Sequence, residues 1–277
     1  MEVLRYAAFT DDPSGGNPAG IVLAAGDLDR TAMQRIAADV GFSETAFLSR
    51  TGPNAADVRY FAPIAEVPFC GHATIAAAVA MAERQGVGAL SLRTPAGRIE
   101  VSTTDTRAGI VATLVSVRPR VSELPDDVID TLLPTLRLTR SDLDPALPVR
   151  VSFAGNSHPI VAVPGPVLDL LDHDQDRLTA VMAENGWGAT VAVVSRTGPA
   201  EFEARHPFPP GGVREDPATG SGAAALGAYL RALDLVDPPV RILIRQGRHV
   251  GRPGVLTVDI PAGDGGIAVS GRAVPMV

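Results

Sequence analysis

Short apolar segments alternate with polar turns along the chain, and 28 glycines and 24 prolines punctuate its 277 residues. Frequent turn residues predict short elements. A polar first turn at Asp29-Arg30 and a glycine at Gly41 frame a helix through Ala38, because glycine readily adopts the left-handed conformation that ends helices. An apolar, alanine-rich run predicts a second helix over 73–84. We expect strands at 3–10, 19–24, 44–50, 56–62, 89–93, 97–102 and 109–117, and a crossing segment at 118–127.

Landmarks of the first half recur in the second half. Two glycine loops each lead into an alanine-rich helix, 72-HATIAAAVAMA-82 and 221-SGAAALGAYLRA-232. The recurrence predicts a duplicated α+β unit. Its halves would be 1–118 and 119–277, facing each other across a cleft, with the last ten or so residues free to pack back on the first half. Asp29, Gly41, Phe61 and Pro63 match Asp176, Gly188, Phe208 and Pro210 at an offset of 147 (176−29), and Glu66, Pro68 and Gly71 match Glu215, Pro217 and Gly220 at 149 (215−66).

Composition excludes several functional classes. The net charge of −7 and a pI near 5.2 argue against a protein that binds nucleic-acid phosphates. All 24 basic residues are arginine, so mechanisms that need a lysine amine, such as pyridoxal-phosphate aldimines, are excluded. Cys70 is the only cysteine, which rules out an intrachain disulfide. The sequence shows neither a secretory signal nor a membrane-spanning run, and we expect a cytoplasmic protein that contacts no membrane.

Gly71 and Gly220 stand where the two alanine-rich helices begin. A helix N-terminus offers unpaired N–H groups and the positive end of the helix dipole, which suit a carboxylate or a developing oxyanion. Taken alone, each glycine is better explained as an ordinary helix-entry turn. The five histidines are scattered and show no metal-ligand spacing, so we expect no metal site and no cofactor.

Polar residues near these glycines are candidates for chemistry. Glu44 shares a strand face with Ala46 and Leu48, and apolar surroundings raise a carboxyl pKa toward the range of a general acid/base. The alternative for Glu44 is a solvated residue at a strand edge. His72 could donate to a carboxylate or pass on a proton, or it could cap the helix or be a core histidine with satisfied hydrogen bonds. Asp216 could accept from an amine or hydroxyl, and Ser221 with the Gly220 amide could hold a carboxylate. Alternatively, Ser221 or Thr219 is a helix N-cap and Asp216 a turn residue before proline, and both interpretations can hold together.

The segments FTDDPSGGNPAGIVL, GFSETAFL, VRYFAPIAEVPFCGHATIAAA and EDPATGSGAAALGAYL resemble the signature blocks of the phenazine-biosynthesis-like (PhzF-like) isomerases. The resemblance runs nearly end to end, through the tail GGIAVSGRAVPMV. It implies the diaminopimelate epimerase fold: two pseudo-symmetric halves, each with a sheet wrapped around a central helix, and an active site in the cleft. It also implies catalytic roles for Glu44, His72 and Asp216, and substrate-binding roles for Asn17, Gly71, Gly220 and Ser221.

Differences between the halves indicate the type of reaction. Related racemases use one thiol from each half, whereas this chain has Cys70 in the first loop and Thr219 in the second, and the 147-residue offset places Val191 opposite Glu44. A threonine hydroxyl is too weak a base to replace a thiolate. A single carboxylate base favours moving a proton within one molecule over inverting a stereocentre.

We therefore expect a cofactor-independent isomerase that migrates a double bond in a small unsaturated amino or hydroxy acid. Its partner would be a small-molecule carboxylate, with a role in specialised-metabolite or antibiotic biosynthesis. The alternatives are an amino-acid racemase or epimerase on the same fold, and a non-catalytic protein that binds small carboxylates. A homodimer is expected, since dimers are the commonest assembly of soluble enzymes.

Overall fold

The computed structural model describes residues 2–276 and divides them into two compact units. The first unit runs up to Val115 and also includes the chain from Ser270 onward. The second unit spans Ser116–Val269. The sequence-based boundary lay at 118/119. Within the described residues, no helix has the length and hydropathy needed to cross a membrane.

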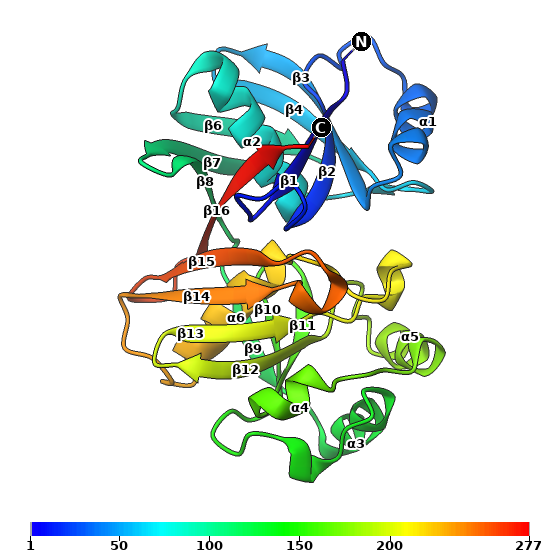
Figure 1. Ribbon diagram of the computed structural model, residues 1–277, viewed down its shortest axis with the longest axis vertical. Coiled ribbons are helices and arrows are strands. Elements are labelled where there is room, and N and C mark those ends of the chain that lie inside the picture. The colour runs from blue at the N-terminus through cyan, green and yellow to red at the C-terminus, as the bar shows by residue number, and fades with distance from the viewer. Residues whose placement is uncertain (1, 277) are drawn as a thin grey trace. The chain divides into compact units, whose positions relative to one another are not determined.

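The first unit closes its strands into a ring around one helix. The order is β1-β2-β3-β4-β6-β7-β8-β16, and β16 also pairs with β1, so the ring has no free edge. The short strand β5 pairs with β4. The bounds are β1 Leu4–Ala8, β2 Asn17–Val22, α1 Arg30–Val40, β3 Glu44–Gly52, β4 Ala55–Phe61, β5 Glu66–Val67, α2 Gly71–Gln85, β6 Ala89–Thr94, β7 Gly97–Thr106, β8 Gly109–Val115 and β16 Ala268–Pro275 (Figure 1).

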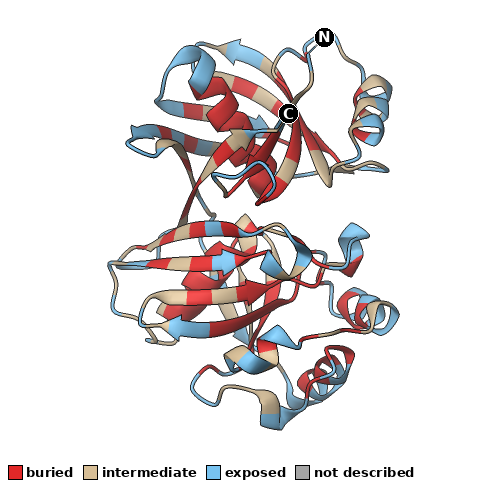
Figure 2. Ribbon diagram, in the orientation of Figure 1, coloured by how far each residue is buried: buried red, intermediate tan, exposed pale blue. Residues whose placement is uncertain are grey.

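Helix α2 forms the centre of this unit. It packs against β1, β2, β3, β7 and β8, and every residue from His72 to Ala82 is buried (Figure 2). Alanine suits this place because its small side chain lets strands approach the helix on all sides. A helix without an exposed polar face is expected to be buried all round, as the sequence predicted.

The second unit also places strands around one central helix, and it adds further helices. Its strands follow the order β15-β14-β13-β12-β11-β10-β9. The central helix α6 packs against β9, β10, β11 and β15. The bounds are β9 Arg120–Glu123, α3 Asp126–Thr135, η1 Arg140–Asp142, β10 Arg150–Phe153, β11 Ser157–Ala162, α4 Gly165–Asp169, α5 Gln175–Glu184, β12 Ala192–Gly198, β13 Glu201–Arg205, η2 Pro209–Gly211, α6 Gly220–Ala232, β14 Val240–Gln246, η3 Arg248–Val250 and β15 Gly254–Ile260.

The predicted crossing segment at 118–127 contains a strand. Strand β9 pairs antiparallel with β10, with Arg120 opposite Phe153 and Glu123 opposite Arg150. Only four residues form this strand, and three of them are polar. Hydrophobic alternation is too short there to be read from sequence, so the strand exists because its backbone pairs with β10.

Strand pairing proves the internal repeat and corrects its register. Both units pair strands in the same sequence of directions: β1-β2-β3-β4-β6-β7 and β10-β11-β12-β13-β14-β15 alternate antiparallel and parallel contacts. A register shift follows Arg50 in β3 and Arg196 in β12, an offset of 146 (196−50). The position equivalent to Glu44 is therefore Thr190 (44+146), and the predicted Val191 is wrong by one residue.

The helix landmarks are also shifted. Asp29 caps α1 by accepting a 2.7 Å hydrogen bond from the Ala32 amide, whereas Asp174, not Asp176, caps α5. The left-handed glycines after the two helices are Gly41 and Gly186. Both pairs give an offset of 145 (174−29 and 186−41). Two acidic residues stand two positions apart at the start of α5, and the sequence alone did not distinguish the capping residue from its neighbour.

Candidate functional site

Glu44 begins β3 and lies in a nearly enclosed polar cluster of the first unit. Its side chain is 14% exposed, and Ala46 and Leu48 on the same strand face are fully buried, as predicted. Burial raises the pKa of Glu44 above its ordinary value, and hydrogen bonds with Ser43 and Cys70 partly oppose that shift. A carboxyl group with a raised pKa can both accept and return a proton near neutral pH.

His72 meets Glu44 from the first turn of α2. Its Nε2 lies 3.4 Å from Glu44 Oε2 and 3.4 Å from Ser43 Oγ. On its other side, the Asn17 amide Nδ2 donates to His72 Nδ1 at 3.1 Å. Because Nδ1 accepts this bond, the neutral ring carries its proton on Nε2, facing Glu44. The ring thus lies between the Glu44 carboxylate and the Asn17 amide, where it can orient the carboxylate or pass on a proton.

Asn17 and Cys70 complete the cluster of the first unit. Asn17 begins β2 and is 1% exposed, so its amide is held rigidly against His72. Cys70 occupies the N-cap position of α2, and its Sγ lies 3.4 Å from His72 Nδ1. The thiol therefore makes polar contacts and is not packed only against apolar groups. Gly71 is the first residue of α2, directly beside these groups.

Among residues 2–276, two groups of side chains have the spacing of metal ligands. Single ligand atoms of Glu44, Cys70 and His72 lie within 4.8 Å of one another. The residues Asp169, Glu203 and His249 form a second such group, but Arg248 pairs with both of its carboxylates. We expected no metal site from the scattered histidines. The first group shows that folding can assemble a carboxylate, a thiol and an imidazole that no sequence motif joins.

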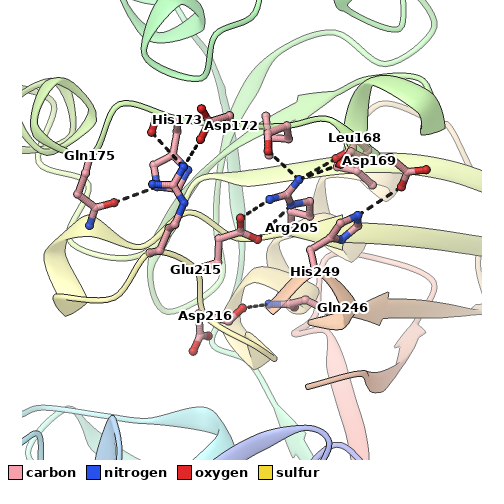
Figure 3. A network of polar contacts seen from close by, with 12 residues as sticks. Leu168, Asp169, Asp172, His173, Gln175, Arg205, Glu215, Asp216, Gln246 and His249 are labelled. Atoms are coloured by element: carbon pink, nitrogen blue, oxygen red, sulfur yellow. Dashed lines mark hydrogen bonds and ion pairs between the residues drawn. The ribbon is translucent and has the colours of Figure 1, made fainter. Parts of the chain in front are cut away.

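Asp216 lies in the second glycine loop, in a network that connects the loop to β14. The Thr219 hydroxyl donates to Asp216 Oδ2 at 2.6 Å. Gln246 Nε2 donates to the Asp216 main-chain oxygen at 2.7 Å (Figure 3). Gln246 Oε1 also accepts from the Thr219 amide at 3.1 Å. Thr219 occupies the N-cap position of α6, but its hydroxyl contacts Asp216 and does not cap the helix. Asp216 is thus a loop residue, and the bond from Thr219 holds its carboxylate in one orientation.

An ion pair braces each glycine loop against the preceding strand. Arg205 at the end of β13 forms a two-point contact with Glu215, and both side chains are at most 10% exposed (Figure 3). Arg59 in β4 makes the corresponding contact with Glu66, at 2.7 Å for both bonds. Arg205 is the equivalent of Arg59 at the 146-residue offset (205−59). These contacts explain why a glutamate recurs five residues before each loop glycine.

Ser221 and Gly220 begin α6, at positions equivalent to His72 and Gly71. The Ser221 hydroxyl contacts His158 Nε2 at 3.0 Å and accepts from Asn156 Nδ2 at 3.4 Å. Sequence analysis overlooked Asn156 and His158, together with Ser43 in the first unit. The register of β2 on β3 matches that of β11 on β12, and this match makes Asn156 the equivalent of Asn17. The equivalence can be recognised only after the strands have paired.

Comparisons with known proteins agree with this architecture. The sequence pattern of the phenazine biosynthesis-like protein family matches residues 6–277. A relative from Escherichia coli O157:H7, named uncharacterized isomerase YddE, is 33% identical over 99% of this chain and 95% of its own length. A relative from Pseudomonas chlororaphis, named trans-2,3-dihydro-3-hydroxyanthranilate isomerase, is 31% identical over 90% of this chain and 86% of its own length.

Solved structures extend the likeness to the fold. A PhzF-family phenazine biosynthesis protein from Bacillus anthracis superposes with a TM-score of 0.88 and 28% identity, covering 100% of this chain and 98% of the other. A probable proline racemase from Agrobacterium radiobacter shares the fold at a TM-score of 0.67 and 15% identity, over 98% and 90% of the two chains. The predicted α+β, diaminopimelate epimerase-like fold is confirmed. With a family match over almost every residue and relatives above 30% identity, the chain belongs to the phenazine biosynthesis-like (PhzC-PhzF) family.

Proposed function

We propose that this protein is an isomerase that moves a proton within a small unsaturated amino or hydroxy acid, using Glu44 as a single acid/base and no bound cofactor. The observation that carries the proposal is the environment of Glu44. A buried carboxyl group with a raised pKa faces an imidazole whose proton lies on the near nitrogen. Carboxyl groups are seldom buried unless they are paired, and a raised pKa within a cluster of polar side chains is typical of acid/base catalysts.

In the proposed reaction, Glu44 removes a proton from a carbon that is conjugated with the substrate's double bond and carboxylate. The C–H electrons enter the conjugated system, and the developing charge is delocalised onto the carboxylate oxygens. A new C–H bond then forms at a distant carbon when Glu44 returns the proton, so the double bond shifts and the substrate formula is unchanged. His72, held by Asn17, keeps the Glu44 carboxylate oriented between the two steps.

The differences between the two units support a single base. Thr190 stands at the position equivalent to Glu44, and Thr219 at the position equivalent to Cys70. Hydroxyl groups replace both the carboxylate and the thiol, and an alcohol is far too weak an acid to exchange protons with carbon near neutral pH. Proton removal and return by the same group is therefore favoured over inversion by two opposed bases.

The substrate class follows from the relatives and remains our proposal. One relative is named for the isomerisation of a dihydro-hydroxyanthranilate, which is a small unsaturated acid bearing amine and hydroxyl groups. We propose a substrate of this chemical class and a role in the biosynthesis of a specialised metabolite.

A racemase or epimerase is the second candidate, and one observation favours it. The Cys70 thiol contacts both His72 and Glu44, so it is placed where a proton-transferring thiolate could form. A thiol mechanism would make Cys70 essential and would invert a stereocentre. The single-base mechanism predicts neither result.

Turnover in deuterium oxide distinguishes the candidates. Cyclic and acyclic unsaturated amino and hydroxy acids would be incubated with the enzyme, and products followed by proton NMR. The proposal expects a shifted double bond, with deuterium at the newly protonated carbon or with the original proton retained there. Inversion of a stereocentre with unchanged double bonds would instead establish the racemase, and binding without turnover across the panel would support a carboxylate-binding protein.

A further inference from the structure

The second unit contains a line of four buried or half-buried polar side chains outside the Glu44 cluster. Ser221 Oγ lies 3.0 Å from His158 Nε2. His158 Nδ1 lies 3.0 Å from both the main-chain oxygen and the hydroxyl of Thr190. The Thr190 hydroxyl continues the line to His206 Nδ1 at 2.7 Å. His158 is fully buried, whereas Ser221 retains partial exposure.

The main-chain carbonyl of Thr190 determines which nitrogen of His158 carries the proton. A carbonyl oxygen can only accept a hydrogen bond, so His158 Nδ1 must donate to it. In the neutral ring, Nε2 is then an acceptor, and the bond with Ser221 must be donated by the serine hydroxyl. Burial lowers the pKa of His158 to about 4, which keeps the ring neutral near physiological pH.

The Ser221 hydroxyl therefore already takes part in two hydrogen bonds. It donates its only proton to His158, and it accepts from Asn156 Nδ2 at 3.4 Å. One lone pair of Oγ remains for a bound molecule. A carboxylate oxygen, which also offers only lone pairs, would be repelled at that place, so the sequence-based expectation that the Ser221 side chain holds a carboxylate is not supported by this arrangement.

Packing around the line leaves little freedom to reorient it. A Cβ added at Gly222 would meet His206 Cε1 at 2.4 Å, so the His206 ring lies directly on the first turn of α6. The rings of His158 and His206 have centroids 6.3 Å apart in an edge-to-face arrangement. Each ring restricts the other, and the hydroxyl of Thr190 joins them.

We propose that His158 is a positioning residue that fixes the Ser221 hydroxyl as a hydrogen-bond acceptor, so that the ligand group facing Ser221 is an amine or a hydroxyl. The internal repeat supports this assignment. Ser221 is the equivalent of His72, Asn156 of Asn17 at the 139-residue offset of β2 and β11 (156−17), and Thr190 of Glu44. The residue that the asparagine contacts is thus an imidazole, His72, in the first unit and an acceptor hydroxyl, Ser221, in the second.

Nitrogen NMR tests the positioning role without any substrate. With ¹⁵N-labelled histidine, we expect His158 to be neutral near physiological pH, with its proton on Nδ1. Ser221→Ala should shift the His158 Nε2 resonance and leave Nδ1 unchanged, because only the hydroxyl donor is lost. His158→Gln identifies the resonances by their disappearance, and circular dichroism checks that each variant is folded.

Thr190→Val is the matched control for this experiment. It disturbs the same buried line but retains the carbonyl that holds His158 Nδ1, so the Nε2 resonance should remain as in the wild type. A proton on Nε2, a charged ring near neutral pH, or an Nε2 resonance that does not respond to Ser221→Ala would each overturn the proposal.

The identity of the facing ligand group is tested by binding, and this step rests on the proposed function. Calorimetry would compare 2-aminobenzoate with benzoate, which lacks the amine. Loss of one hydrogen bond in Ser221→Ala should weaken 2-aminobenzoate about five- to tenfold and leave benzoate nearly unaffected. Equal weakening of both would show that Ser221 contacts the carboxylate and would overturn the donor assignment. Failure of both compounds to bind the wild type counts against the proposed substrate class, while the NMR result still decides the role of His158.

Discussion

Glu44 is the candidate acid/base, and its burial lowers the stability of the folded protein at neutral pH. Because burial raises its pKa in the folded state, the native protein favours the protonated form. Its stabilising contribution is present at low pH, below the unfolded pKa, and is lost as the pH rises through the raised folded value. At neutral pH the residue is therefore a burden on stability, which is typical of a functional group and not of a structural one.

Glu44→Gln should separate these two effects. The amide keeps the shape and removes the base, so turnover should fall at least ~100-fold. Thermal unfolding near pH 7 should show an unchanged or raised Tm, because the buried charge is gone. A variant that keeps near wild-type turnover on the true substrate would contradict the assignment of the base.

Cys70 distinguishes the isomerase from the racemase. In the proposed mechanism the thiol contacts His72 and Glu44 but transfers no proton. Cys70→Ala should therefore retain most of the turnover and lose a modest amount of stability. Cys70→Ser is the companion variant, since it restores a hydrogen-bonding group of similar size. If both variants are folded and inactive, the thiol takes part in proton transfer and the single-base mechanism must be abandoned.

Dialysis against a chelator tests whether the enzyme needs a bound metal ion. Although Glu44, Cys70 and His72 have ligand spacing, the proposed mechanism uses them as proton carriers and hydrogen-bonding groups. Dialysis against a chelator should therefore leave turnover unchanged, with metal content measured by mass spectrometry before and after treatment. Activity that disappears on dialysis and returns with one particular metal would show that the cluster is a metal centre.

At the scale of elements, the two ion pairs that brace the glycine loops form a natural comparison. Arg205 and Glu215 are 10% and 4% exposed, and Arg205 also donates to the main-chain oxygens of Leu168 and Leu171. Arg59 and Glu66 are 35% and 19% exposed. Solvent screens the second pair and can hydrate either partner when the other is removed, whereas the first pair is shielded from water.

Glu215→Ala should consequently cost about 3–5 kcal/mol of unfolding free energy, because it leaves a buried guanidinium without its counter-charge. Glu66→Ala removes the equivalent residue in the more exposed pair and should cost about 1 kcal/mol or less. Urea denaturation of both variants measures the difference directly. Similar losses in the two variants would mean that burial does not govern the strength of these braces.

At the scale of the whole molecule, the C-terminal strand β16 belongs to the first unit from Ser270 onward, although it lies far from that unit's other strands in sequence. Strand β16 pairs with β1 through Tyr6 opposite Pro275 and Ala8 opposite Ala273, and it closes the ring around α2 (Figure 1). Without this strand, β1 and β8 would both become free edges. The stability of the whole ring therefore depends on the pairing of β16 with β1 and β8.

Truncation after Val269 should therefore destabilise the first unit selectively. Hydrogen exchange followed by mass spectrometry should show lost protection in β1, β2 and β8, while strands β11 to β13 of the second unit remain protected and serve as the internal control. Uniform loss of protection in both units would show that they unfold together, and unchanged protection in β1 would show that the closure contributes little.

Much of this protein could be predicted from sequence because the signals are local. Asp29 and Gly41 delimit α1 by capping and left-handed geometry, and the alanine-rich runs of α2 and α6 indicate buried helices. Glu44 and His72 are candidates because one lies on an apolar strand face and the other beside a loop glycine, and because the resemblance to the PhzF-like isomerases assigns both a catalytic role. Such features depend on neighbours within a few residues, and the amino-acid sequence alone determines them.

Other features required the tertiary structure. Ser221 and His158 are 63 residues apart, and Arg205 meets Leu168 from 37 residues away. The 146-residue offset that identifies Thr190 as the equivalent of Glu44 arises from strand register, since a shift of one residue turns a side chain to the opposite face of a sheet. The sequence by itself determined the repeated unit, its helices and the candidate acid/base. Only the folded chain decided which distant polar groups share a hydrogen bond, because that choice depends on strand pairing and on the burial it produces.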